Sequence, residues 1–150
     1  MATPADIPTI VRVINAAFSV ETFMEGPRTN EDEGAELFRK GTFLLAEKRG
    51  HVAASVYVEL RGEHGYFGML AVDPRHQGTG LGRLLIEAAE DHCRTQGCRH
   101  MEISVLSLRP ELPPLYRKLG YVETGTQAFR PSRPLRAGLT CHCIVMSKKL

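Results

Sequence analysis

The stretch between residues 66 and 106 constrains the fold most, because two strand-like segments flank one long helical pattern in it. The segment Tyr66–Val72 is apolar and rich in β-forming residues, and it ends at the turn pair Asp73-Pro74. Apolar residues then recur at helical spacing from Leu81 until the second strand-like segment, His100–Leu106. A strand–helix–strand unit of this kind joins two parallel strands and places its helix on one face of their sheet.

The rest of the chain adds hairpins and further helices. We expect a first helix at Asp6–Phe18, capped by Asp6, and a short second helix that Asn30 caps and Gly41 ends. The other expected elements are strands at Thr42–Glu47, His51–Leu60 and Leu139–Met146 and a short helix at Glu111–Leu119. A chain of 150 residues suits one domain, residues 1–150. The order predicts an α/β fold with a mixed, mostly antiparallel central sheet and helices on both faces.

The long helical pattern also predicts which of its side chains face the core. The expected buried stripe consists of Leu81, Leu84, Leu85, Ala88, Ala89 and His92. The charged residues are expected mostly on the other faces, and these are Arg83, Glu87, Glu90, Asp91 and Arg94. The helix would therefore have one apolar side and one charged side.

Charge and hydropathy exclude several classes of partner. Lys and Arg total 19 and Asp and Glu total 17, and the net charge of +2 is too weak to indicate nucleic acid binding. The sequence has no run of 18 apolar residues and does not begin with a basic segment followed by an apolar stretch. We therefore expect no membrane partner and no secretory signal. Four cysteines are too few for a disulfide scaffold, which favours a cytoplasmic protein with reduced thiols.

The segment Cys141-His142-Cys143 raises the question of a metal site. In a strand, the two cysteines would point to one side and the histidine to the other. No second pair of ligands has the spacing of a zinc site. We therefore expect small buried cysteines here and no metal.

A glycine-rich turn separates the strand Tyr66–Val72 from the long helix. Gly78, Gly80 and Gly82 leave the backbone uncovered, so that a ligand can approach its N–H groups. The first N–H groups of a helix have no internal partners, and the helix dipole adds partial positive charge. Such a site suits a phosphate or a pyrophosphate, and Arg75 and Arg83 could add charged hydrogen bonds.

Two common phosphate-binding patterns do not fit this turn. The P-loop needs Lys followed by Ser or Thr after its second glycine, and the chain lacks that pair. The dinucleotide fingerprint that begins at Gly78 would need a third glycine where Arg83 stands. A glycine-rich turn that only starts the helix is the simpler structural interpretation, and a protein for another phosphate ligand is a further alternative.

The segment Arg75-His-Gln-Gly78-Thr-Gly80 resembles the R/Q-x-x-G-x-G/A signature of the GNAT superfamily of N-acetyltransferases. Leu70-Ala-Val-Asp-Pro74 resembles the strand before that signature, and Leu115-Tyr-Arg-Lys-Leu-Gly-Tyr121 resembles the C-terminal L-Y-x-K-x-G-F/Y segment. Ala2-Thr-Pro-Ala-Asp-Ile-Pro8 is similar to the usual start of the first helix. The motifs stand in the family's order, so the resemblance covers nearly the whole chain.

The resemblance implies transfer of an acetyl group from the cosubstrate acetyl-CoA directly to an amine in a ternary complex, with no metal. It assigns the pantetheine arm to the strand Leu70, Ala71 and Val72, where a bulge turns an N–H group toward the thioester carbonyl. It assigns the pyrophosphate to the turn, and the residues concerned are Arg75, Gln77, Gly78, Thr79, Gly80, Leu81, Gly82 and Arg83.

Tyr116 matches the general acid of the superfamily. A thiol pKa of ~8.5 against ~10 for a phenol makes a positioned tyrosine a suitable proton source for a leaving thiolate. The family's common base, a Glu just before Leu70, is absent, because Gly68 and Met69 stand there. The candidates to replace it are Glu102, which we favour, and Glu59, Glu63, His64 and Glu21.

Two further departures concern the pantetheine site and the first strand. The family often places an Asn upstream of the tyrosine, and here Ser107 could take part of that role. The first strand is nearly absent, because the helix begins just after Met1. Because the family's common base is missing, the main alternative function is a non-catalytic acyl-CoA-binding sensor or regulatory module, which the retained Tyr116 disfavours.

The acceptor amine has no motif of its own. We expect a small-molecule or peptide amine, in a pocket shaped by residues 19–30 and 128–138. The resemblance also allows a homodimer through the last strands.

Overall fold

The computed structural model describes residues 1–20, 27–129, 135 and 138–150. Its α-helices are α1 (Ile7–Ala17), α2 (Glu31–Lys40), α3 (Leu81–Thr95) and α4 (Leu112–Lys118), and its 3₁₀ turns are η1 (Pro4–Asp6), η2 (Phe18–Val20) and η3 (Pro74–His76). Its strands are β1 (Thr42–Lys48), β2 (His51–Arg61), β3 (His64–Val72), β4 (His100–Leu106), β5 (Val122–Ala128) and β6 (His142–Lys149).

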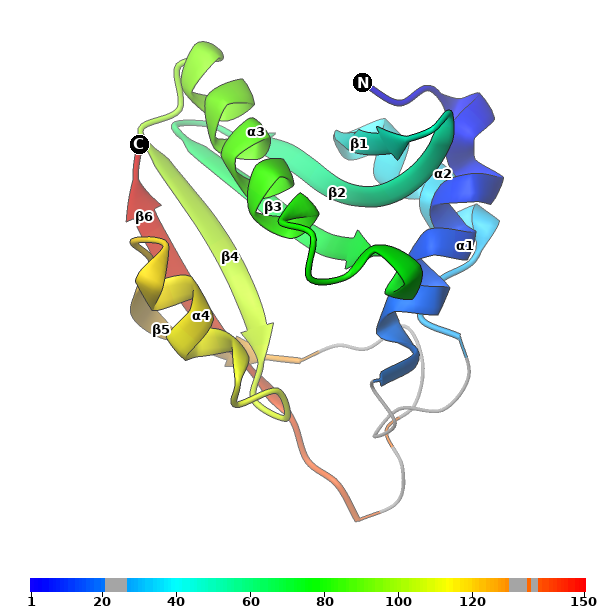
Figure 1. Ribbon diagram of the computed structural model, residues 1–150. Helices are drawn as coiled ribbons and strands as arrows, with labels where there is room; N and C mark the ends of the chain where they lie inside the picture. The colour runs from blue at the N-terminus through cyan, green and yellow to red at the C-terminus, as the bar shows by residue number, and fades with distance from the viewer. Residues whose placement is uncertain (21–26, 130–134, 136–137) are drawn as a thin grey trace.

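The strands form one six-stranded sheet in the order β1-β2-β3-β4-β6-β5. All neighbours are antiparallel except β3 and β4, which α3 connects in parallel. One core cluster packs α3 and α4 against one face, and the other packs α1 and α2 against the opposite face (Figure 1). The predicted α/β fold, a mixed and mostly antiparallel sheet with helices on both faces, is confirmed.

The strands β3 and β4 pair only at one end. His64, Gly65 and Tyr66 are in register with His100, Met101 and Glu102, and beyond these pairs the two strands diverge (Figure 1). β3 also carries a bulge at the far end. Tyr57 of β2 pairs with Gly68, whereas Ser55 pairs with Ala71, so β3 contains one extra residue there. Met69 takes a left-handed φ of 50° within this bulge, which bends β3 away from a regular ladder.

The helix α3 is rotated relative to the predicted stripe. Leu84 is 60% exposed and Ala88 is also exposed, whereas Ile86, Glu90 and Cys93 are buried. Placing Leu84 and Ala88 in the core, and Glu90 outside it, was wrong. Ile86 and Cys93 supply the apolar contacts instead, because they lie three residues before and four residues after Ala89, on the side that faces the sheet.

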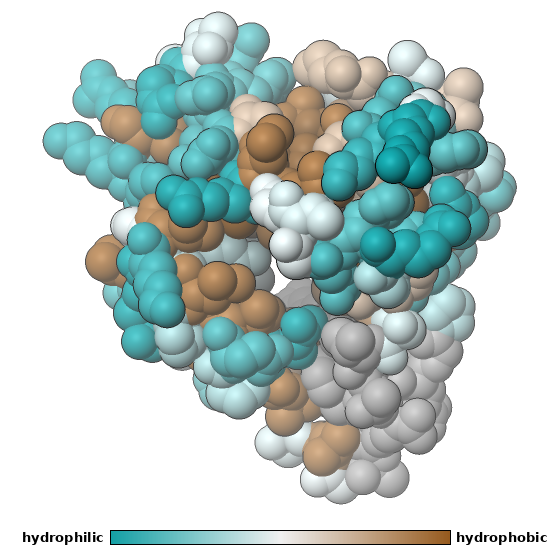
Figure 2. Space-filling view, viewed as in Figure 1, coloured by the Kyte–Doolittle hydropathy of each residue, from teal (hydrophilic) through white to brown (hydrophobic). Residues whose placement is uncertain are grey.

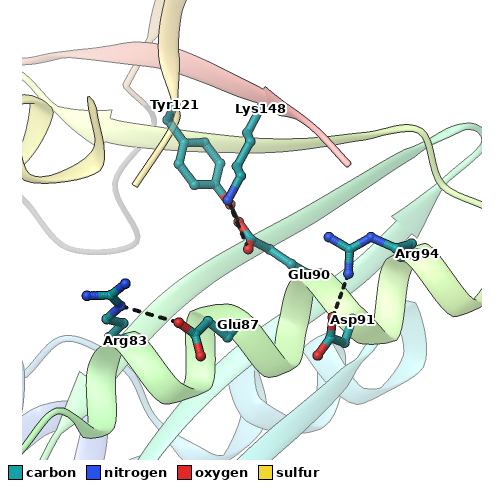
Figure 3. A network of polar contacts seen from close by, with 7 residues as sticks. All are labelled: Arg83, Glu87, Glu90, Asp91, Arg94, Tyr121 and Lys148. Carbon is teal, nitrogen blue, oxygen red and sulfur yellow. Dashed lines mark hydrogen bonds and ion pairs between the residues drawn. The ribbon is translucent and has the colours of Figure 1, made fainter. Parts of the chain in front are cut away.

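Glu90 is 6% exposed because it has partners for its charge. The Tyr121 hydroxyl donates to Glu90 Oε2 at 2.7 Å, and Lys148 Nζ lies 3.0 Å from the same oxygen (Figure 3). A buried carboxylate is tolerated when hydrogen bonds and an opposite charge replace water. The exposed pairs Arg83–Glu87 and Arg94–Asp91 lie on the outer side of the same helix (Figure 3).

Several element boundaries differ from the prediction. Asp6 does not cap α1; its carboxylate accepts the Thr3 N–H at 2.9 Å and closes the preceding turn η1. Asn30 does cap α2, through the Glu33 N–H at 2.9 Å. The last strand begins at His142 rather than at Leu139. β5 was not predicted at all, because its sequence VETGTQA is polar and every residue in it is exposed.

The residues before α1 contact the outer edge of the sheet at β1. The Ala2 N–H donates to the Phe43 carbonyl of β1 at 3.0 Å. Within the described residues, no strand pairs with β1 on that side.

Candidate active site

The glycine-rich turn forms an open cradle before α3. Gly78 and Gly80 take left-handed φ values of 78° and 82°, which glycine adopts at little cost. A Cβ at either position would meet no atom within 4 Å, so the space above the turn is open. Gly82 instead faces β3, where a Cβ would lie 3.7 Å from a Val72 methyl group. The turn therefore exposes main chain and brings the first turn of α3 close to β3.

A cavity of about 450 Å³ lies over this cradle. Its lining includes Leu70, Val72, Gln77, Gly78, Gly80, Leu81 and Gly82, all of which belong to the predicted cofactor site. The Thr79 hydroxyl donates to the His76 carbonyl and closes the turn. The N-terminus of the 15-residue helix α3 opens into this cavity and brings unpaired N–H groups and partial positive charge.

The two predicted arginines are paired beside this cavity rather than lining it. Arg75 donates to both carboxylate oxygens of Asp73, at 3.2 and 3.0 Å, and Arg83 lies 3.3 Å from Glu87. The hydrogen bonds from Arg75 lower the pKa of Asp73 to about 2. Asp73 also accepts the Arg75 N–H, so one buried carboxylate fixes the exit of β3.

A larger cavity of about 730 Å³ fills the gap where β3 and β4 diverge. It shares Phe18, Leu70, Arg109 and Leu115 with the smaller cavity, so the two adjoin. In the space-filling view the molecule is hollowed between its two lobes, and hydrophobic side chains gather beside the hollow (Figure 2). The opening of one parallel strand pair therefore creates a path from the glycine-rich turn into the sheet.

Tyr116 stands on α4 and lines the larger cavity. Its side chain is 9% exposed, and its ring lies 6.1 Å from that of Phe67 and 6.0 Å from that of Tyr121. Burial raises the pKa of Tyr116, and the positive charge of Arg109 opposes this in part. A neutral phenol held against a cavity wall is a proton donor at neutral pH.

The bulge of β3 reaches the same cavity. Gly68, Met69 and Leu70 line it opposite Ile103, Ser104 and Val105 of β4. Ala71, which was also predicted to contact the cofactor, is buried in the cluster that includes α1 and is in neither cavity lining. A bulge takes backbone groups out of the ladder, and here it does so beside Tyr116.

The candidate bases lie apart from this cavity. Glu59, Glu63, His64 and Glu102 are not among its described lining residues, and Glu21 lies outside the described residues. Burial alone would raise the pKa of Glu59, but hydrogen bonds from Arg61 and Tyr57 outweigh it and hold the pKa below its ordinary value. A carboxylate stabilised in this way is a weak base.

The Ser107 side chain bonds to the start of β6 and does not reach the cavities. Its hydroxyl accepts the His142 N–H at 3.0 Å and contacts Cys141 Sγ at 3.6 Å, and it is not in either cavity lining. Arg109, two residues further on, lines both cavities. Arg28, Arg61 and Arg109 were missed by the sequence analysis, because no motif joins three arginines from such distant segments.

The described residues contain no group of three or more His, Cys, Asp or Glu side chains placed to hold a metal ion. Cys93, Cys98, Cys141 and Cys143 are free thiols, and Cys143 faces the larger cavity. Within the same part of the chain, none of the helices is both long and apolar enough to span a membrane.

Comparison with known proteins identifies this architecture. The mycothiol acetyltransferase of Saccharopolyspora erythraea is 30% identical over 133 residues, which cover 83% of this chain and 43% of that protein. Glucosamine 6-phosphate N-acetyltransferase 1 of Oryza sativa subsp. japonica is 31% identical over 112 residues, 69% of this chain and 66% of that protein. The chain thus spans less than half the length of the mycothiol acetyltransferases that it matches.

Solved structures agree on the fold. The ribosomal-protein-S18-alanine N-acetyltransferase from Escherichia coli superimposes with a TM-score of 0.81 at 21% identity, over 99% of this chain and 90% of that one. A Salmonella typhimurium structure with its cofactor acetyl-CoA gives 0.74 at 21% identity, over 99% and 91%. The acetyltransferase (GNAT) family model matches residues 8–121. The chain therefore belongs to the acetyltransferase (GNAT) family.

Proposed function

We propose that this protein transfers an acetyl group from acetyl-CoA to an amine. The observation that carries the proposal is the continuous path from the glycine cradle, along the bulged end of β3, to Tyr116. Each part of this path has the chemistry that one part of the cosubstrate requires: N–H groups for phosphate, a strand edge for amides and a buried phenol for the sulfur end.

The cradle residues fit the anionic end of acetyl-CoA. In this proposal the N–H groups from Gln77 to Gly82, with Thr79 and Leu81 between the glycines, bind the pyrophosphate. Arg75 and Arg83 would supply charge from the side, each in exchange for its present carboxylate partner. The open space over Gly78 and Gly80 is the volume that a phosphate needs, and a side chain there would fill it.

The edge of β3 fits the pantetheine arm. The main chain of Leu70, Ala71 and Val72 would pair with its amides, because β4 has diverged and leaves this edge without a neighbouring strand. Ser107 was expected to help, but Arg109 is better placed, since it lines both cavities.

Acetyl-CoA, when bound, supplies the acetyl thioester. Around it, an N–H group freed at the bulge would donate to the carbonyl oxygen, and the Tyr116 Oη would hold the proton needed at the leaving sulfur. No described carboxylate lines the cavity, so proton removal from the amine would run through water, with Glu102 as the base that the sequence analysis favours. Apolar walls at Phe67, Leu112 and Leu115 would exclude bulk water.

A thermal-shift titration with acetyl-CoA, CoA and ATP tests the binding half of the proposal. A ligand at 100 times its Kd stabilises the fold by ~2.7 kcal/mol, or on the order of 5–10 °C for a chain of this size. Gly78→Asp should abolish the shift, because it fills the cradle and adds negative charge. Gly50→Asp is the matched control: Gly50 has the same φ of 78° and the same open surroundings, but it lies in the β1–β2 turn. Equal shifts in both variants would contradict the assignment.

The lack of a described carboxylate at the cavity favours one other function, a non-catalytic acyl-CoA sensor. Turnover of acetyl-CoA with a panel of amines separates the two. Binding with amine-dependent release of CoA supports the transferase, whereas binding without release by any amine supports the sensor.

A further inference from the structure

The larger cavity has a cationic end away from the cradle. Arg28 and Arg61 line it together with Tyr66, and none of the three lines the smaller cavity over the glycines. The guanidinium of Arg61 lies 4.1 Å from the centre of the Tyr66 ring, and that of Arg28 lies 5.5 Å from the centre of the Phe18 ring. The positive charges of both arginines act on the Tyr66 hydroxyl, so they converge on one region.

Neighbouring carboxylates do not cancel this charge. Glu59 accepts from Arg61 Nε at 2.8 Å, which fixes that side chain and uses one of its five N–H donors. Glu102 also acts on Arg61, but neither carboxylate is among the described lining residues. Arg28 has no ion pair with any described residue, and its stacking on Phe18 leaves its N–H groups to other partners. The described residues that line this part of the cavity therefore include arginines and no carboxylate.

We propose that this end of the cavity binds the anionic group of the acceptor, so that the substrate is a small amine that also carries a carboxylate or a phosphate. The inference rests on the proposed acetyl transfer. Arginine recognises both anions through charged, often bidentate hydrogen bonds. A total volume of about 730 Å³, part of which the acyl end of acetyl-CoA takes, leaves room for a small molecule.

The position of these arginines explains why the anion matters. Arg61 stacks on Tyr66, which precedes the bulge on β3, whereas the glycine cradle follows the end of that strand. An anionic group held by the arginines would direct the amine end of the same molecule toward the bulge. A purely cationic amine would be repelled from the same region, because its charge would meet two guanidinium groups.

Two matched pairs of amines test this inference and separate the two anions. One pair is glucosamine 6-phosphate and glucosamine, and the other is L-phenylalanine and L-phenylalaninamide. We expect kcat/KM to be at least 10-fold higher for the anionic member of one pair or of both. The amide is the weaker base, so its amine is more often neutral, and this bias runs against the expected result.

Arg28→Gln and Arg61→Gln should each raise KM for the anionic amine by at least 10-fold and leave the neutral amine and acetyl-CoA unaffected. Arg61→Lys keeps the charge and should lose less, and it covers the case in which Arg61→Gln unfolds without its contact to Glu59. Arg94→Gln is the control, because Arg94 is paired with Asp91 on the exposed side of α3. The measurement is steady-state kinetics, with the fold checked by thermal melting.

Neutral amines used as well as their anionic partners, or variants that weaken both alike, would overturn the inference while acetyl transfer itself still stood. If acetyl-CoA binds but no amine reacts, the proposed function fails, and calorimetry in the presence of CoA then decides this inference separately. Binding of the anionic amines that Arg28→Gln weakens at least 10-fold supports the subsite, and equal binding of the neutral ones refutes it.

Discussion

The two ends of the β3–β4 pair differ, because the strands are hydrogen-bonded at one end and separated by a cavity at the other. At the closed end, His64, Gly65 and Tyr66 pair with β4, and Gly65 lies so close to α3 that an added Cβ would be 2.5 Å from Cys93 Sγ. At the open end, the strands diverge, Met69 takes a left-handed φ, and a cavity replaces the ladder. Dense packing at one end therefore holds the strands in a geometry that keeps the other end open.

The two tyrosines of the segment 115–121 repeat this contrast. Their rings lie 6.0 Å apart, yet Tyr121 is fully buried and bonded to Glu90, while Tyr116 lines the cavity. Burial is the largest cause that raises the pKa of each, and for Tyr121 the bond to Glu90 adds to it. One phenol thus ties α3 to the closed end, and the other stays neutral and accessible at the open end.

The largest effect is expected when the phenol hydroxyl of Tyr116, at the open end, is removed. Tyr116→Phe should lower kcat by about 100-fold, equivalent to about 2.7 kcal/mol, because a positioned general acid contributes on the order of 10²–10⁴. Its melting temperature should stay close to that of the parent. Tyr121→Phe is the matched control for activity, and a similar loss of kcat in both variants would refute a special role for Tyr116.

A smaller effect, on stability, is expected at the closed end. Gly65→Ala should destabilise the fold by about 2 kcal/mol, because the new methyl group overlaps Cys93 and the core must shift. Urea unfolding measures this. Gly125→Ala on β5 is the control, since a Cβ there meets nothing within 4 Å. If both variants unfold alike, tight packing is not what holds the closed end.

The contacts of Glu90 with Tyr121 and Lys148 at the closed end should contribute somewhat less to the stability of the fold. Tyr121→Phe removes one donor from the buried carboxylate of Glu90 and leaves Lys148 in place, so we expect a loss of about 1.5 kcal/mol. Chemical denaturation of this variant, of Lys148→Met and of the double variant gives the coupling between the two donors. Additive losses would show that they act independently, contrary to a shared network.

The smallest effect is expected at Asp73, which holds the turn directly after β3 through its hydrogen bonds with Arg75. Its pKa is lowered to about 2 from 3.8, so the folded protein binds fewer protons than the unfolded chain between these values. The ion pair therefore stabilises the fold above about pH 4, and this contribution is lost as the pH falls through about 2. Asp73→Asn should cost on the order of 1 kcal/mol at pH 7, because Arg75 is exposed. A difference from the parent that is as large at pH 2 as at pH 7 would contradict this origin.

Sequence patterns predicted the fold wherever a strong local signal agreed with the tertiary structure. The strand His100–Leu106 and the cap at Asn30 are confirmed, and so are the parallel unit around α3 and the mixed sheet. β5 was not predicted, because it is an exposed edge strand with no apolar alternation. The burial of Glu90 was not predicted, because it depends on Tyr121 and Lys148, which lie far away in the sequence.

The candidate site could be predicted only where a contiguous sequence motif marks it, as for the glycine-rich turn and for Tyr116. The turn glycines and Leu70–Val72 form a local motif, and the structure places their cavity beside that of Tyr116. Arg28 and Arg61 come from a loop and from the end of β2, and only the packing of α1 against the sheet brings them together. Ser107 shows the converse, since a suitable residue type is already bonded to His142.

The short pairing of β3 with β4 also has a mechanical consequence. With three register pairs, the β3–β4 ladder is the shortest in the described sheet, and the β1–β2–β3 and β4–β6–β5 halves are joined by these pairs and by the core cluster around α3. A ligand whose amides pair with the edge at Leu70–Val72 would add hydrogen bonds where β3 and β4 have none, and would make this part of the sheet more rigid. Amide hydrogen exchange along this edge should then slow far more than exchange at the closed end, which is already bonded.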